Sequence, residues 1–290
     1  MSETANPTSH TYFSQRLRLH YLDWGNAQAP HMLMVHGMRD HCHTWDWMAQ
    51  KLRQDYHIVA PDLRGHGDSA WVMGSSYSHM DYVYDLAQLI RQARLEPVTL
   101  VAHSLGGTLA CQLAGLYPDA VARMVVIEGV GLGWSRRFER MAPHERIMNW
   151  IDNTWKLAGR EPRRYESLDE AYQRMQKSNK HLTPEQARHL TIHGSNQNED
   201  GTYSWKFDNY THANAPYDIP ADDVQALWER ITCPVLFINS KQGFPGRTGQ
   251  GDSLQHFRNA RVMDIDQAGH WTHHDQLDAV LAATTDFLRE

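Results

Sequence analysis

The sequence places one serine where a buried hydrophobic run gives way to two glycines. The stretch LVAHSLGG covers residues 100–107, with Ser104 two positions after Ala102 and two positions before Gly106. Small residues on both sides allow the backbone to turn sharply and to raise the hydroxyl above its surroundings. A serine hydroxyl is a weak nucleophile near neutral pH unless a base takes its proton. The spacing therefore predicts a nucleophile on a strand-to-helix turn, with an ordinary buried turn serine as the alternative.

A histidine near the C-terminus is the candidate base. The stretch DIDQAGHWTHH carries His270 just after a hydrophobic run that we predict to be a strand. A loop in that position opens at the edge of a parallel sheet where the strands' carboxyl ends meet. The rivals His273 and His274 fall within or at the start of the last predicted helix. We therefore expect His270 to accept the proton of Ser104.

The elements that must position these residues alternate along the chain. A hairpin is predicted over 11–23. Four continuously apolar runs, typical of strands covered on both faces, occupy 31–37, 57–63, 98–104 and 122–129, and two further strands are predicted over 234–240 and 260–266. Helical patterns occupy 44–54, 79–95, 105–118 and 273–290. Strands that alternate with helices predict an α/β domain with a parallel sheet and right-handed crossovers.

The alternation stops between residues 134 and 222. This segment is rich in charge and tryptophan and has helical patterns, for example over 146–157. Another helix is predicted to begin at Pro184, with Thr183 as its N-cap. We therefore predict a core domain formed by 1–133 and 223–290, interrupted by a helical domain over 134–222.

Composition excludes several classes of protein. The 290 residues are 41% hydrophobic and 21% charged, with a net charge of −6, which argues against a nucleic-acid binder. No apolar run approaches the length of a membrane span, so membrane insertion is not expected. The N-terminal residues show no secretory pattern. Cys42, Cys111 and Cys233 lie far apart, so we expect a reduced, cytoplasmic protein. The sequence carries no indication of oligomeric state.

No cofactor is expected. The glycines of GVGLG (129–133) do not have the spacing of a dinucleotide-binding loop, because Trp134 stands where the third glycine would be. The segment HCH at 41–43 raises the question of a metal site, but the sequence shows no cluster of carboxylates or cysteines beside it. We therefore expect a loop of exposed histidines there and no metal.

The motifs together resemble the α/β-hydrolase superfamily over nearly the whole chain. The segment MVHGMRDHCHTW, with Trp45 nine residues after His36, resembles the family's HG loop. PDLRGHGDS (61–69) is characteristic of the subgroup that contains epoxide hydrolases, haloalkane dehalogenases and small esterases, and GHW near the end completes the set. The resemblance implies the α/β-hydrolase fold, a mostly parallel sheet flanked by helices, with the 134–222 insertion as a cap.

The same resemblance implies roles for several residues. The oxyanion donors would be the backbone N–H groups of Met38 and Leu105. Epoxide hydrolases and haloalkane dehalogenases of this shape use an aspartate where this chain has Ser104. A serine forms an acyl-enzyme, so the substitution points to acyl transfer from esters, thioesters or lactones.

The acid that orients the histidine departs from the usual position. Many relatives carry an aspartate in the loop after the strand at 234–240, but Gly243 stands at the aligned position. Asp252 lies nine residues further on and is a poor replacement. Glu128 ends the 122–129 run, where some relatives carry the acid. We therefore predict a triad of Ser104, Glu128 and His270, with a structural carboxylate that pairs with an arginine as the alternative role of Glu128.

Other residues are expected near the mouth of the site. Asp62 and Arg64 are predicted to hold the oxyanion loop by hydrogen bonds, and Trp45 to lie near the mouth. Arg39 could contact a substrate carboxylate, although a solvated or salt-bridged arginine is the simpler expectation. The candidate pocket residues are Arg39, Trp134, Trp155 and Trp271.

These residues predict a serine hydrolase acting on a small-molecule ester and water, with small to medium hydrophobic acyl groups. Thioesters and lactones remain open as substrates. A different reaction on the same triad, such as C–C bond hydrolysis, perhydrolysis or cyanohydrin cleavage, is one alternative. A hydrolase-fold sensor that binds a small molecule with little turnover is another, because fold and function separate easily.

Overall fold

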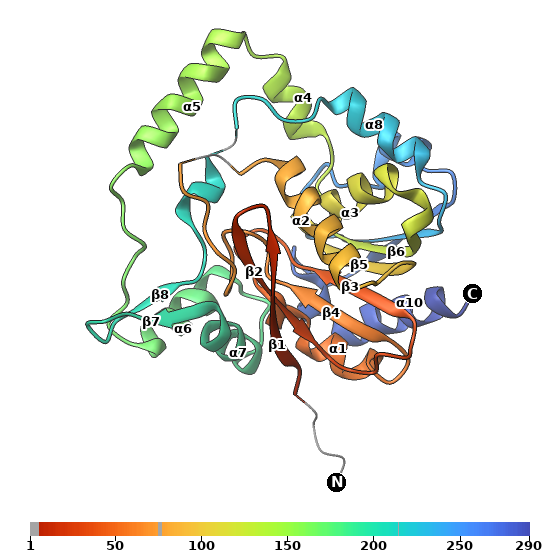
Figure 1. Ribbon diagram of the computed structural model, residues 1–290, viewed down its shortest axis with the longest axis horizontal. Coiled ribbons are helices and arrows are strands. Elements are labelled where there is room, and N and C mark those ends of the chain that lie inside the picture. The colour runs from red at the N-terminus through yellow and green to blue at the C-terminus, as the bar shows by residue number, and fades with distance from the viewer. Residues whose placement is uncertain (1–5, 75–76, 214) are drawn as a thin grey trace.

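An eight-stranded sheet forms the centre of the molecule (Figure 1). The computed structural model describes residues 6–74, 77–213 and 215–290, with the side chain of Trp134 outside the description. The strands run in the order β1-β2-β4-β3-β5-β6-β9-β10. Their bounds are β1 Thr8–Ser14, β2 Leu17–Asp23, β3 His31–Val35, β4 His57–Pro61, β5 Val98–His103, β6 Val121–Ile127, β9 Val235–Ser240 and β10 Ala260–Ile265.

The strand directions follow the alternation in the sequence. The predicted hairpin is confirmed, with β1 antiparallel to β2, and β2 is also antiparallel to β4. Each neighbouring pair from β4 through β3, β5, β6 and β9 to β10 is parallel. The carboxyl ends of the parallel strands therefore share one edge of the sheet, where the turns after β5, β6 and β10 can meet.

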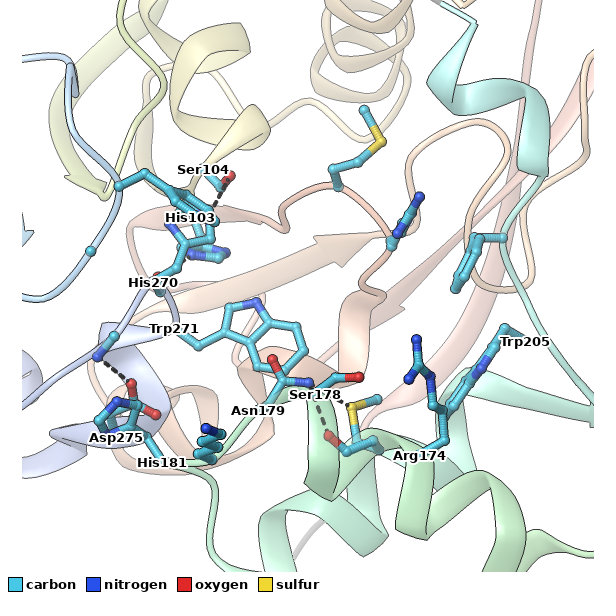
Figure 2. Close-up of a pocket in the computed structure, with 18 of the residues that line it drawn as sticks. His103, Ser104, Arg174, Ser178, Asn179, His181, Trp205, His270, Trp271 and Asp275 are labelled. Carbon is cyan, nitrogen blue, oxygen red and sulfur yellow. Dashed lines mark hydrogen bonds between the residues drawn. The ribbon is translucent and has the colours of Figure 1, made fainter. Parts of the chain in front are cut away.

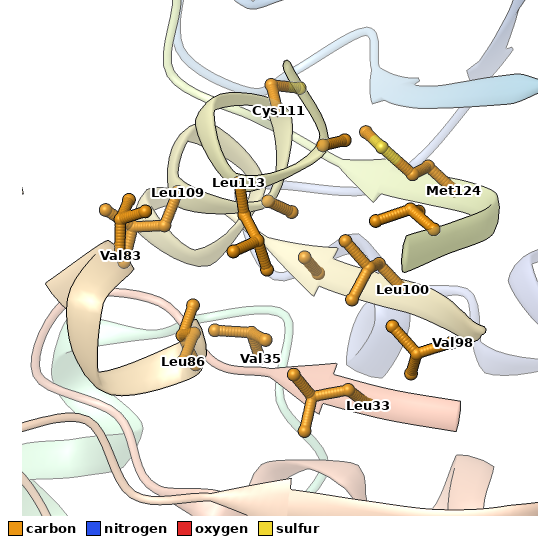
Figure 3. Close-up of a cluster of buried hydrophobic side chains, with 14 of the residues drawn as sticks. Leu33, Val35, Val83, Leu86, Val98, Leu100, Leu109, Cys111, Leu113 and Met124 are labelled. Atoms are coloured by element: carbon orange, nitrogen blue, oxygen red, sulfur yellow. The ribbon is translucent and has the colours of Figure 1, made fainter. Parts of the chain in front are cut away.

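Helices cover both faces of this sheet because its central strands β3, β4, β5 and β9 are apolar and buried on both sides. Successive side chains of a strand point to opposite faces. Leu33 packs with α2 and α3 on one face, whereas Met32 packs with α1 and α10 on the other. Figure 3 shows the first of these clusters, with Leu86 and Leu113 pointing from their helices toward Leu33 and Leu100. The core helices are α1 Asp46–Leu52, α2 His79–Gln92, α3 Leu105–Leu116, α9 Thr272–Asp275 and α10 Leu277–Arg289, with a 3-10 turn η1 at Cys42–Trp45.

A long connection between β6 and β9 carries further elements. They are α4 Gly133–Glu139, α5 Pro143–Leu157, α6 Leu168–Ser178, α7 Pro184–Gly194, β7 Ser195–Gln197, β8 Tyr203–Trp205, η3 Asn209–His212 and α8 Ala221–Arg230. Thr183 caps α7 as predicted, since its hydroxyl accepts a hydrogen bond from the backbone N–H of Gln186 at 3.2 Å. In Figure 1, α5 lies away from the sheet, while α6, α7 and the β7–β8 hairpin lie close together. By contrast, α8 returns to the core, where Val224 and Trp228 join the cluster around α3.

Cys42, Cys111 and Cys233 are free and buried. Within residues 6–74, 77–213 and 215–290, every helix is too short or too polar to cross a bilayer.

Candidate active site

Ser104 occupies a strained turn between β5 and α3. Its backbone has φ 52° and ψ −118°, a conformation that residues other than glycine rarely adopt. Its N–H donates to the carbonyl oxygen of Ile127 at 2.9 Å, which fixes the turn against β6. The glycine two residues later is required by close approach, because a Cβ on Gly106 would lie 2.6 Å from the carbonyl oxygen of His36. Local structure therefore holds the hydroxyl at the carboxyl edge of the sheet.

His270 faces that hydroxyl from the loop after β10. Its Nε2 lies 2.8 Å from the Oγ of Ser104, and Figure 2 shows this contact as a dashed line. The loop is fixed by His103, whose Nε2 hydrogen-bonds the carbonyl oxygen of His270 at 2.8 Å. The rivals His273 and His274 are buried in α9, and their Nε2 atoms contact the hydroxyl of Thr44. Of the three histidines, His270 is the one that the structure brings to Ser104.

Glu128 completes a chain of contacts from the turn after β6. It is fully buried, and its Oε2 lies 3.2 Å from the Nδ1 of His270. Its Oε1 accepts hydrogen bonds from the backbone N–H of Ser240 at 2.6 Å and from the Arg247 guanidinium at 2.5 Å. A carboxylate in this position favours the tautomer in which Nδ1 carries the proton and Nε2 faces Ser104. The other candidate, Asp252, is an exposed residue of η4 (Gly251–His256).

Arg247 is a site residue that sequence reasoning missed. It lies in the loop after β9, is largely buried, and pairs with Glu128. The pairing neutralises a carboxylate that would otherwise be costly to bury. Nothing in the spacing of the loop NSKQGFPGRTGQGD indicates which of its cations would turn inward.

The predicted oxyanion donors are the backbone N–H groups of Leu105 and Met38. Leu105 is the first residue of α3, where an N–H has no acceptor within the helix. Met38 lies on the loop after β3 and lines the same cavity as Ser104. That loop is held by His36, whose Nε2 accepts from the backbone N–H of Leu63 at 2.9 Å.

Of the two residues predicted to hold the Met38 loop, Asp62 contacts that loop and Arg64 does not. Asp62 accepts a hydrogen bond from the backbone N–H of Cys42 at 2.7 Å and so fixes the end of the loop that carries Met38. For Arg64 the prediction was wrong, because its guanidinium pairs with Asp85 on α2, at 2.6 Å from Nε. Arg64 therefore ties the loop after β4 to α2.

A cavity of about 940 Å³ opens beside Ser104 and is walled by the core and by the β6–β9 connection. Arg39 and Trp271 line it. Trp155 does not, since it is 76% exposed on α5. The prediction for Trp45 was also wrong, because its ring is fully buried in the core. The side chain of Trp134 lies outside the described residues.

Sequence reasoning missed most of the aromatic wall of this cavity. Trp205 comes from β8, Phe207 follows it, and Phe244 lies in the loop after β9. The ring of Phe244 is 4.5 Å from that of His270, measured between centroids. Figure 2 shows Trp271 between the Ser104–His270 pair and the end of α6. Aromatic surface therefore borders the reacting groups.

Basic side chains outnumber acidic ones in the cavity. The basic residues are Arg39, Arg163, Arg174 and Lys180, together with the histidines. The acidic residue among those that the structure describes there is Asp275, which accepts a hydrogen bond from the backbone N–H of Gly269 at 2.7 Å. Burial raises the pKa of Asp275. An anionic group would therefore meet a favourable potential in this cavity.

The histidine segment 41–43 differs from the expectation of an exposed loop. His41 and Cys42 are buried, and His43 is half-buried. A carboxylate does stand beside it, because Asp46 follows at helical spacing with its Oδ2 2.8 Å from the Nδ1 of His43. His189 also contacts this carboxylate, from α7. The sequence alone does not indicate that α7 packs against this segment.

Comparison with known proteins gives consistent results. A family model described as the alpha/beta hydrolase fold matches residues 30–277. Esterase Rv0045c from Mycobacterium tuberculosis is 26% identical over 266 residues, which cover 90% of this chain and 83% of the relative. Uncharacterised proteins of Mycobacterium bovis and Mycobacterium tuberculosis are 37% identical over 106 residues, but the match spans only 31% of their length and 37% of this chain.

Solved structures agree on the fold. The thioesterase domain from the curacin biosynthetic pathway superposes with a TM-score of 0.84 at 20% identity, covering 96% of this chain and 99% of that domain. At this level of identity the likeness concerns the fold.

Proposed function

This chain belongs to the alpha/beta hydrolase fold family, and from that premise we propose that it is a serine hydrolase that cleaves carboxylic esters through an acyl-enzyme on Ser104. The observation that carries the proposal is the continuous line of contacts from Ser104 Oγ through His270 to Glu128, at the edge of a large cavity. The relative named an esterase supports an ester as the substrate.

The first half-reaction forms the acyl-enzyme. Ser104 Oγ bonds to the acyl carbon while its proton moves to Nε2 of His270. The carbonyl oxygen becomes an oxyanion that accepts hydrogen bonds from the N–H groups of Met38 and Leu105. When the C–O bond to the alcohol breaks, the departing oxygen takes the proton from His270. Glu128 holds the ring in the required tautomer and stabilises its charged form.

The second half-reaction releases the acid. Water gives a proton to Nε2 of His270 and adds its oxygen to the acyl carbon, forming a second oxyanion. Collapse of this intermediate breaks the bond to Ser104, and the serine oxygen recovers its proton from His270. The products are a carboxylic acid and an alcohol, and the enzyme returns to its starting state.

The segment 134–222 acts in this proposal as a cap over the core formed by 1–133 and 223–290. Support comes from the cavity wall, to which the connection contributes Tyr165, Met175 and Trp205. An apolar acyl group would pack against the aromatic side chains near His270. The cap then determines which acyl groups fit.

The cations of the cavity support a further feature of the substrate, a negative charge away from the scissile bond. Arg39 is exposed and, within the described part of the chain, has no carboxylate partner. Its guanidinium carbon lies 5.6 Å from the centroid of the Phe207 ring. Arg174 lines the cavity too, and Figure 2 shows it beside Trp205. An ester that carries a carboxylate would satisfy these groups.

The proposal is tested with p-nitrophenyl esters of increasing acyl length, comparing wild-type protein with Ser104→Ala. We expect rapid release of p-nitrophenol that depends on Ser104. Absence of turnover on every ester and thioester would favour C–C bond hydrolysis or perhydrolysis on the same triad. Stoichiometric labelling by a phosphonate without multiple turnover would favour a sensor. Either result would overturn the esterase proposal.

A further inference from the structure

A group of three histidines and one aspartate lies between the core and α7. His43 and Asp46 come from the start of η1 and α1, three residues apart. His189 and His193 are four residues apart on α7, so they project from the same side of that helix. One potential donor atom from each of the four lies within 4.8 Å of the other three. None of the four residues lines the cavity beside Ser104.

The distances within the group approach those of a coordination shell. The Oδ2 of Asp46 lies 2.8 Å from Nδ1 of His43 and 3.0 Å from Nε2 of His189. In a tetrahedral zinc site with bonds of about 2.0 Å, neighbouring donors are roughly 3.3 Å apart. The Asp46–His43 and Asp46–His189 donor distances therefore need to lengthen by only a few tenths of an ångström for an ion to bind between them.

His193, the fourth potential ligand, lies close enough to bind the same ion. Its ring stacks on that of His43, with centroids 3.7 Å apart, and lies 4.5 Å from the ring of His189. Among the described residues, no hydrogen bond holds the imidazole of His193, so the ring can turn toward an ion without breaking one.

The carboxylate at the centre has unused binding capacity. Oδ1 of Asp46 is buried and lacks a hydrogen-bond partner in the described part of the chain. Burial of an unpaired carboxylate oxygen is unfavourable unless a cation is close. The side chains of His43 and His189 are 20% and 26% exposed, which leaves an entry path from solvent.

We propose that His43, Asp46, His189 and His193 form a binding site for a divalent transition-metal ion of the Zn²⁺ class. Three imidazole nitrogens and one carboxylate oxygen are a donor set suited to Zn²⁺ or Co²⁺ rather than to Ca²⁺ or Mg²⁺. The ion would join η1 and α1 to α7. It would thus fasten the β6–β9 connection to the segment that follows the Met38 loop, and its role would be structural.

Protonation states support this assignment. Burial and the neighbouring His43 lower the pKa of His193 to about 4, so its ring is neutral near pH 7. Burial raises the pKa of Asp46, but its hydrogen bonds with His189 and His43 together with the charges of these histidines bring it below its usual value. Neutral imidazoles and an ionised carboxylate are the forms that bind metal.

The test uses the full chain without an affinity tag, freed of metal by a chelator. Titration with Co²⁺, followed by visible absorption, should give one four-coordinate ion per chain, and Zn²⁺ should displace it. His193→Gln and His189→Gln should each weaken binding by at least about 100-fold, the upper end of what losing an outer-shell partner costs. The control His144→Gln, at an exposed position on α5, should bind as the wild type does.

A second measurement separates binding at this site from adventitious binding. Zn²⁺ should raise the melting temperature of the wild type and of His144→Gln, but not of His193→Gln. The proposal is overturned if the metal-free protein shows no saturable binding, or if the two α7 variants bind Co²⁺ as tightly as wild type. In either case the cluster would be a hydrogen-bonded network alone.

Discussion

The carboxylate of Glu128 fills the space that a side chain at position 243 would need. A Cβ built on Gly243 falls on this carboxylate, with the Glu128 Cδ only 2.6 Å away. The glycine at the position where many relatives carry an aspartate and the glutamate at the end of β6 are therefore parts of one arrangement. A single acidic group fits behind His270, and in this chain it comes from β6.

Replacing Glu128 by glutamine tests whether this group orients His270. An amide cannot stabilise the charged imidazole and can hold the wrong tautomer, so we expect kcat on a p-nitrophenyl ester to fall by about 10²- to 10⁴-fold. Circular dichroism should show a folded protein. Asp252→Asn is the matched control and should retain near-normal turnover. If Asp252→Asn loses activity and Glu128→Gln does not, the assignment of the acid is wrong.

Transferring the acidic group from position 128 to position 243 tests whether the two positions share one space. Gly243→Asp alone should be poorly active or unstable, because the new side chain overlaps Glu128. Glu128→Gly removes that overlap and also relieves the positive φ of 51° at position 128. We expect the double variant to recover at least about tenfold in kcat/KM over Glu128→Gly. Equal activities of the double variant and Glu128→Gly would contradict the shared-space interpretation.

Substitution of Arg39 tests the charge preference of the cavity. Arg39→Gln should raise KM for an ester with a terminal carboxylate by about tenfold or more, as expected for losing one charged hydrogen bond. The KM for an uncharged ester of equal length should change little. Arg258→Gln, at an exposed position outside the cavity, controls for net charge. Equal effects on both esters would assign Arg39 to loop structure rather than to substrate charge.

Buried histidines predict a loss of stability in mild acid. Burial lowers the pKa of His36 and His41 to about 4, and that of His66 and His274 to about 3. Between about pH 6.5 and these values the unfolded chain binds more protons, so the free energy of unfolding falls as pH falls. Asp40, whose pKa burial raises to about 7, acts in the opposite direction but is one group against four.

Urea unfolding measured from pH 7.5 to 4.5 checks this expectation. Each of these histidines lowers the free energy of unfolding by at most about 1.4 kcal/mol per pH unit within its window. We expect a steep decline below about pH 6.5, reduced in His274→Gln if that variant folds. A stability that is constant down to pH 4.5 would show that these side chains are accessible to protons in the native state.

Much of the fold follows from the sequence because its strands and helices carry local signals. Continuous apolar runs predicted the central parallel strands, and Thr183 followed by Pro184 predicted the start of α7. The residues predicted for the triad do lie together, because each follows a parallel strand and these strands end at one edge.

The remainder depends on contacts that no local pattern records. Arg247 turns inward because Glu128 needs a buried partner, which cannot be seen from the loop after β9 alone. Residue type alone does not distinguish Trp155, which is exposed on α5, from Trp205, which lines the cavity. Likewise, the contact between His189 and Asp46 depends on how α7 packs on the core.

The central claim is that Ser104 carries the acyl group. Rapid mixing with a p-nitrophenyl ester, followed by acid quench and peptide mass spectrometry, measures this directly. We predict a burst of about one p-nitrophenol per chain and an acyl adduct on the peptide that contains Ser104. Ser104→Ala should show neither, while Ser253→Ala, outside the cavity, should behave as the wild type does. Full turnover by Ser104→Ala, or an adduct on another residue, would contradict the proposed mechanism.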